Sequence, residues 1–193
     1  MISHQLINQI NQLREESSVE NERAPLRISA QSDMVRVSAE LIDCDRLGYL
    51  LTVLEAARTG ENREGCTEGD SPQIADRIRT LLGQITYLME ELILVEETED
   101  FSRVLMRSAK PDKRADGIYY YELMLEQGEA IRLDRRCYNF ETRRRVAVPF
   151  TVSKEIFERL VADFEEVLGK GEAHATELPL RFEAPPSIWE TAY

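Results

Sequence analysis

The fold is decided by residues 117–139, GIYYYELMLEQGEAIRLDRRCYN, in which two apolar-rich runs flank a short polar turn at Gly128 and Glu129. Apolar and polar side chains alternate in both runs, which is the period of half-buried antiparallel strands. Similar runs, joined by short polar turns, precede and follow this pair. The sequence therefore predicts an antiparallel meander over 92–151, with strands at 92–98, 101–109, 117–127, 130–139 and 143–151.

Helical periodicity appears on both sides of the meander. Three segments repeat apolar residues at spacings of three and four: 1–23, 73–91 and 152–168. The first carries one narrow stripe of Ile2, Leu6, Ile10 and Leu13, which needs something to pack against. In the second, Gly83 lies in the interior and suggests a close helix contact. Ser153 is expected to cap the third helix.

The segment 24–58 is predicted to form a hairpin followed by a helix. Residues 26–30 and 35–39 alternate across a Gln-Ser-Asp turn, which indicates two paired strands. Asp43 is a suitable N-cap for a helix carrying Leu47, Leu50, Leu51 and Leu54. We expect a single α+β domain over 24–168, interrupted by a mobile loop at 59–72 and followed by an extended tail at 169–193.

The charge is unevenly distributed. Residues 101–151 hold eleven Lys and Arg against seven Asp and Glu, a local charge of +4 in a chain of −12, so the remainder carries −16. Such a chain would repel a nucleic-acid backbone over most of its surface, while one basic face could still bind an anion or an acidic partner.

Alternation along the predicted strands assigns many of these arginines to one face, with Val104, Met106, Ile131, Leu133, Val146 and Val148 on the core side. Glu122, Glu126 and Asp134 are expected on the same face as the arginines, where cross-strand ion pairs would neutralise them. The alternative is a binding surface, to which the tail would add an aromatic anchor. The candidate binding residues are Arg103, Arg107, Tyr120, Arg132, Arg136, Arg143, Arg145 and Trp189.

The residues of common catalytic and metal sites are scarce. His4 and His174 are the two histidines, and no Gly-rich phosphate loop or nucleophile elbow is present. The three cysteines match neither a disulfide framework nor a zinc ribbon. We expect no enzymatic activity, no metal and no cofactor. The N-terminus lacks the features of a secretion signal and no apolar run could span a membrane, so a cytoplasmic location is expected.

The order of a meander leading into a capped helix, after a shorter strand-and-helix unit, resembles the Whirly-like single-stranded nucleic-acid-binding fold, and small cyanobacterial proteins of that fold most closely. The similar residues lie at 37–41 leading into 45–47, at 88–91 leading into 95–100, and in the tyrosine-rich strand before 125–128. The resemblance spans roughly residues 30–168. It implies a twisted antiparallel sheet with flanking helices and a tendency to oligomerise, and it supplies no catalytic residues.

Two functional hypotheses follow. The first is a non-catalytic protein-interaction module, an assembly or regulatory factor that forms a homo-oligomer and presents the arginine face and the apolar terminal segments to protein partners. The alternative is a single-stranded DNA- or RNA-binding protein that uses the same face, although the net charge of −12 disfavours it. Neither hypothesis involves a membrane.

Overall fold

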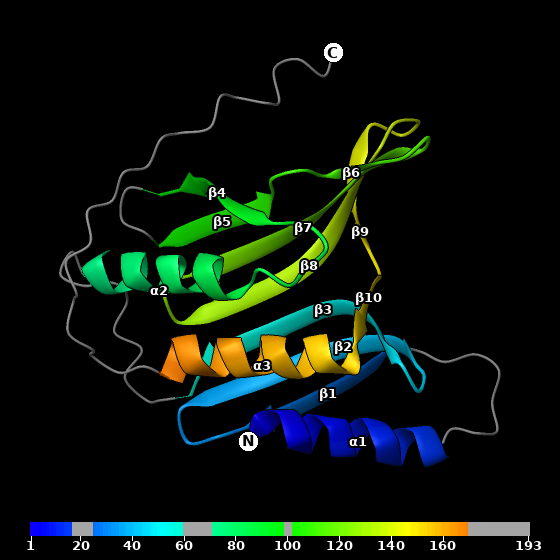
Figure 1. Cartoon of the computed structure of the whole chain (residues 1–193), viewed down its shortest axis with the longest axis vertical. Helices are drawn as coiled ribbons and strands as arrows, with labels where there is room; N and C mark the ends of the chain where they lie inside the picture. Colours follow the sequence, from blue (N-terminus) through cyan, green and yellow to red (C-terminus); the bar gives the residue numbers. More distant parts are fainter. Residues whose placement is uncertain (17–24, 60–70, 99–101, 170–193) are drawn as a thin grey trace.

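A computed structural model describes residues 1–16, 25–59, 71–98 and 102–169. These parts of the chain form three helices and one ten-stranded sheet (Figure 1). In chain order, the elements are α1 (Ile2–Glu16), β1 (Leu26–Gln31), β2 (Val35–Cys44), β3 (Gly48–Arg58), α2 (Ser71–Gln84), β4 (Leu92–Glu97), β5 (Arg103–Ser108), β6 (Asp112–Lys113), β7 (Gly117–Glu126), β8 (Ala130–Asn139), β9 (Arg144–Val148), β10 (Phe150–Ser153) and α3 (Lys154–Gly169).

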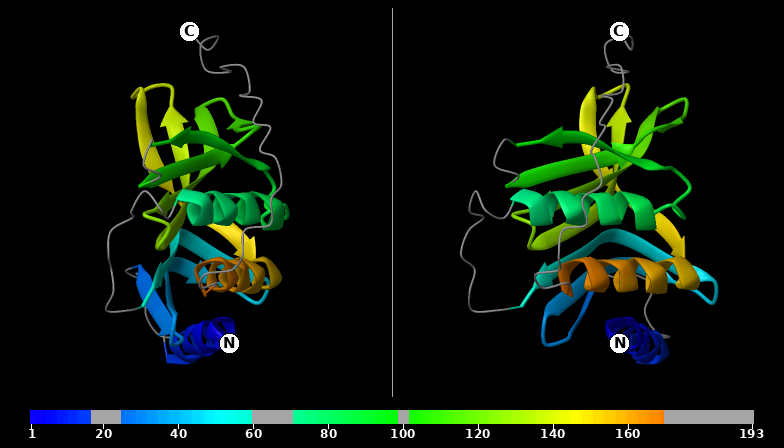
Figure 2. Two further views of the ribbon diagram at one scale, coloured as in Figure 1. Left: turned by 90° about the vertical axis from the view of Figure 1, so that its left-hand side faces the viewer. Right: turned by 60° about the vertical axis from the view of Figure 1, so that its left-hand side comes forward.

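The sheet is antiparallel at each strand pair, with the order β1-β2-β3-β8-β7-β5-β4. Three short strands lie off this path: β10 pairs with β3, β6 with β7 and β9 with β8. The three helices lie side by side in one layer over one face of the sheet (Figures 1 and 2). The predicted α+β class, an antiparallel meander with flanking helices, is confirmed.

The core lies between the sheet and the helix layer. On β7 and β8 the side chains of Leu123, Leu125, Ile131 and Leu133 are buried on the helix side, as alternation predicts. Helix α3 packs mainly against β3, β2 and β10. Its buried residues, Phe157, Leu160, Val161, Phe164, Val167 and Leu168, belong to the same core. Ser153 caps this helix by accepting a hydrogen bond from the backbone N–H of Ile156 at 3.2 Å, which places α3 where the cap predicts.

The predicted helix after Asp43 is wrong, because these residues form β3. Asp45 makes a tight turn instead, since its carboxylate accepts hydrogen bonds from the backbone N–H groups of Leu47 and Gly48, both at 2.7 Å. The register between β2 and β3 then shifts, so that Thr52 has no directly opposed partner. This bulge places Leu51 and Leu54 on the same buried side, which imitates the spacing of a helix.

The second predicted helix, 73–91, is too long, because α2 ends at Gln84. Tertiary contacts hold the following segment out of the helix: Leu88 is buried in the core and Glu90 pairs with Arg135 on β8. The expected close helix contact at Gly83 is also wrong, since a Cβ placed there would meet nothing within 4 Å among the described residues.

The apolar stripe of the first helix is part of the core. Ile2, Leu6 and Ile10 are buried against β1 and α3, and the side chain of Gln9 donates a hydrogen bond to the carbonyl of Ser29 on β1 at 2.9 Å. The expectation that this segment presents its stripe to a partner is therefore wrong. The predicted mobile loop falls largely in 60–70, and the predicted tail in 170–193, both outside the described residues.

Strand β9 departs from its predicted burial. Val146 is 44% exposed, although alternation places it on the core side. The reason is that β3 pairs with β8 only along 130–134, while β9 pairs with the far half of β8, 135–139, which extends beyond the core. No helix in the described parts of the chain is long and apolar enough to cross a membrane.

Candidate binding surface

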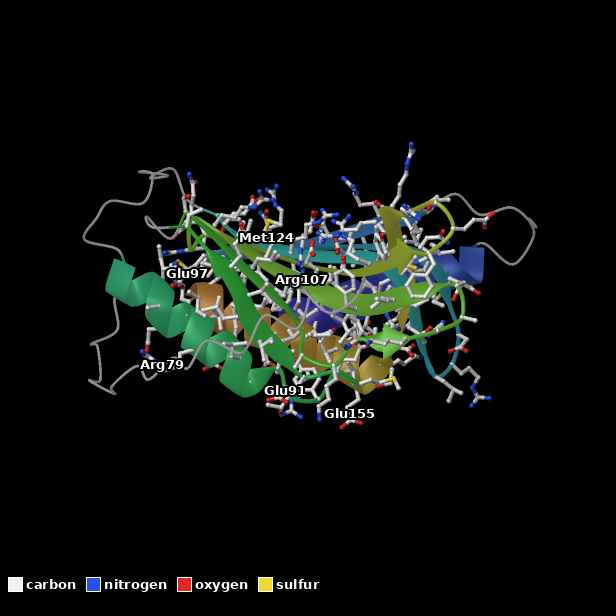
Figure 3. All side chains as sticks on the ribbon, turned by 90° about the horizontal axis from the view of Figure 1, so that it is seen from above. Arg79, Glu91, Glu97, Arg107, Met124 and Glu155 are labelled. Atoms are coloured by element: carbon white, nitrogen blue, oxygen red, sulfur yellow. The ribbon has the colours of Figure 1, made fainter. Side chains whose placement is uncertain are left out.

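One face of the sheet is turned away from the helices, and we call it the open face. Viewed from above in Figure 3, Arg107 and Met124 project on this side, whereas Arg79 and Glu155 lie on the helix side. The strand register places Arg132 opposite both Glu55 and Met124, and Arg107 opposite Glu122. The predicted gathering of arginines and carboxylates on one face is therefore what the register produces.

The arginines of the open face are held in a network of ion pairs. Arg107 Nε lies 2.8 Å from Glu122 Oε2, and Arg136 donates to both oxygens of Asp134 at 2.8 and 2.9 Å. Arg132 bonds Asp134 at 3.2 Å and also pairs with Glu55. The Asp134 side chain is only 3% exposed and lies between two guanidinium groups. The positive charge of this part of the face is therefore balanced by carboxylates.

Tyr120 packs against the arginines of this network. Its side chain is buried, and Arg107 Cζ lies 5.6 Å above the centre of its ring. Burial raises the pKa of its phenol, while Arg145, Arg107 and Arg136 lower it. The ring therefore packs beneath the arginines rather than offering a free surface for stacking.

A shallow groove of about 380 Å³ crosses the open face at the ends of β3 and β8. Its floor contains Ala57 and Ala130, which oppose each other in the register, because small side chains leave space there. Arg36, whose guanidinium bonds the amide oxygen of Gln31 at 3.0 Å, lines one part of it. The remaining lining includes Ser38, Glu55, Met124, Glu126 and Arg132, so both signs of charge meet in the groove.

The remaining arginines among the predicted binding residues take no part in this network of ion pairs. Arg103 is exposed, and its Nε lies 3.2 Å from the sulfur of Met124. Arg143 and Arg145 lie on the hairpin that joins β8 to β9, and Arg143 adopts a positive φ of 53°. Trp189 lies outside the described residues.

This hairpin extends beyond the body of the sheet (Figure 1), and we call residues 138–146 the basic arm. Its turn is fixed by Asn139, whose side-chain oxygen accepts hydrogen bonds from the N–H and hydroxyl of Thr142. Phe140 is 46% exposed and stacks edge-on against Tyr138. None of the ion pairs found among the described residues involves Arg143, Arg144 or Arg145. The arm therefore carries three neighbouring arginines without an ion pair among the described residues.

The turn between β6 and β7 contacts the start of the arm. The phenol of Tyr119 donates to Asp116 Oδ2 at 2.6 Å, and Arg114 lies over its ring at 4.3 Å. Hydrogen bonds to Asp116 and to Cys137 raise the pKa of Tyr119 to about 12, and the pKa of Asp116 is lowered by the same Tyr119 bond. The backbone N–H of Phe140 also donates to the Asp116 carbonyl at 3.0 Å.

Sequence reasoning missed two exposed residues of the arm, Phe140 and Arg144. Strict alternation assigns Arg144 to the core face, but no core lies under β9. The available signal was the run Arg143-Arg144-Arg145 so close to an aromatic residue. Arg135, by contrast, is structural, since it pairs with Glu90 at 2.9 Å with both side chains largely buried. No cluster of three or more His, Cys, Asp or Glu that could hold a metal occurs among the described residues.

Comparisons with known proteins add little to this geometry. No protein-family model matches the chain, and no curated protein matches it. Among solved structures, the crystal structure of WHY1 from Arabidopsis thaliana is similar with a TM-score of 0.20 and 9% sequence identity, covering 77% of this chain and 86% of that one. A score this low carries no argument about function, and the α+β architecture itself comes from the strands and helices described above.

Proposed function

We propose that this chain is a non-catalytic interaction protein that docks a protein partner on its open face. The observation that carries the proposal is the charge balance of that face, where Arg107, Arg132 and Arg136 each pair with a carboxylate. A nucleic-acid backbone offers only negative charge and would have to compete with Asp134 and Glu122 for these arginines. A protein surface offers both signs and can exchange ion pairs with the network.

The groove gives such a partner a place to insert a side chain. Its volume of about 380 Å³ falls within the range of small binding pockets. Ala57, Ala130 and Met124 supply apolar contacts, while Arg36 and Glu126 supply charges of opposite sign. Buried apolar anchors surrounded by polar contacts are the usual arrangement at the centre of a protein interface.

Filling the groove should abolish docking. We expect Ala130→Trp to reduce capture of specific proteins from a nuclease-treated extract of the source cells at least about tenfold, since tenfold corresponds to 1.4 kcal/mol of lost binding. Thr86→Trp is the matched control, because it adds the same ring at an exposed position between α2 and β4. Quantitative mass spectrometry of the captured proteins makes the comparison. Equal capture by Ala130→Trp and the wild type would refute docking at the groove.

A second candidate function, single-stranded nucleic-acid binding, is favoured by the basic arm alone. Arg143, Arg144 and Arg145 have no carboxylate partner among the described residues, and the exposed Phe140 offers a ring on which a base could stack. Three phosphate contacts on a single strand predict a slope of about −2 in log affinity against log salt.

Labelled single-stranded DNA and RNA oligomers in a salt series test this candidate. The triple variant with glutamate at 143, 144 and 145 should lose binding, whereas Arg132→Glu on the open face should retain it. Binding that survives the triple change would rule out the arm as the contact.

A further inference from the structure

The outer edges of the sheet differ in whether another element of the chain covers them. At β1, helix α1 packs alongside the strand, and Gln9 bonds the Ser29 carbonyl. β4 pairs only with β5, and β9 only with β8, among the described strands. Their outer edges are therefore positions where a further strand could be added.

These two edges carry opposite charges. β9 presents Arg144 and Arg145 beside Val146, which is 44% exposed. β4 presents Glu96 and Glu97 beside Val95, which is 37% exposed. Two copies that met through the same edge would place like charges together, which is unfavourable. Contact between unlike edges would pair cations with anions and cover two exposed valines.

We propose that copies of this chain associate head to tail, with β9 of one copy against β4 of the next. The strand register supports this match on both faces. Arg145 and Glu96 project from the open face, because they are opposed to Tyr138 and Leu105 respectively. Arg144 and Glu97 project from the helix-covered face. When two copies align their open faces, an arginine therefore lies near a glutamate on each side of the joined sheet.

The same alignment fixes the direction of the strands. Each step from β9 through β8, β7 and β5 to β4 is antiparallel, so β9 and β4 run in the same direction within one chain. The joined edges of aligned copies are therefore parallel. A register shift between Leu94 and Glu96 interrupts β4, which limits backbone pairing and leaves ion pairs as the main attraction. The association is therefore salt-sensitive.

In a pair of copies joined through unlike edges, one β4 edge and one β9 edge stay free to bind further copies. Such heterologous contacts generate closed rings or open chains rather than two-fold dimers. The open face and its groove stay accessible in this arrangement, so the self-association is independent of the proposed docking of a partner.

Charge reversal tests the inference without touching the groove. Sedimentation velocity at low salt should give the wild type a mass above one chain that falls as salt is raised. The variants Glu96→Lys with Glu97→Lys, and Arg144→Glu with Arg145→Glu, should each sediment as single chains. Mixed in equal amounts, these two variants should associate again, because the β4 and β9 edges are both basic in the first variant and both acidic in the second.

The mixing step shows whether the variants lose mass because the contact between β9 and β4 is broken, rather than because their net charge has changed. A wild type that stays a single chain at low salt and high concentration would overturn the inference, and so would variants that fail to associate on mixing. Circular dichroism checks that both variants fold, as expected for changes at exposed positions. The lysine variant leaves the basic arm intact, so its loss of mass with retained oligonucleotide binding would distinguish self-association from nucleic-acid binding.

Discussion

Replacing Leu6 with alanine is expected to lower the free energy of unfolding by about 2–5 kcal/mol, the range for removing a fully buried leucine side chain. Leu6 is completely buried on α1, and together with Ile2 and Ile10 it belongs to the hydrophobic core that the helices form with the sheet. Truncation would leave a cavity between α1 and its neighbours β1 and α3. Urea unfolding monitored by circular dichroism measures the effect.

The control is Gln5→Ala, one residue earlier on the exposed side of the same helix. It should change the free energy of unfolding by no more than about 0.5 kcal/mol. Equal stability of the Leu6 and Gln5 variants would show that α1 is not part of the core. In that case its apolar stripe would again be available to a partner, as the sequence suggested.

Replacing Asp134 with alanine is expected to cost about 3 kcal/mol of folding free energy, the lower end of the range for breaking a buried ion pair. The carboxylate is nearly fully buried and accepts bonds from Arg132 and Arg136. Both guanidinium groups retain contact with water, being 45% and 30% exposed, which places the effect at the lower end. Thermal and urea unfolding would measure it.

Glu126→Ala provides the comparison, because Glu126 is an exposed carboxylate on the same face of β7. A similar loss of stability in both variants would contradict the central role of Asp134 in the network. The Asp134 variant also makes the open face more positive. Oligonucleotide binding that appears only in this variant would show that the carboxylates normally exclude nucleic acid from the face.

The meander was predictable because its signals are local. On β7 and β8 the alternation of apolar and polar residues follows directly from the pleat of a strand, and the turn at Gly128 separates the two runs. The cap at Ser153 likewise acts on a backbone N–H only three residues away. Such features depend on neighbours in the chain, which the sequence displays.

The same reasoning from alternation failed where a register shift or the edge of the core changed which side chains are buried. The register shift between β2 and β3 brings Leu51 and Leu54 to one side, so a strand carries the spacing of a helix. Val146 follows the correct alternation and yet is exposed, because the core ends before β9. In both cases the burial of a side chain was set by the strand register and by the extent of the core, which the alternation of residues does not show.

The candidate binding surface was also predictable only in part. The sequence by itself determined that arginines and carboxylates share one face of the meander, since parity along a strand is a property of the chain. Only the tertiary structure decided which of those charges are balanced, because Arg132 meets Glu55 across 77 residues. It also decided that α1 belongs to the core, and that Arg143, Arg144 and Arg145 have no ion pair among the described residues, because their hairpin extends beyond the body of the sheet.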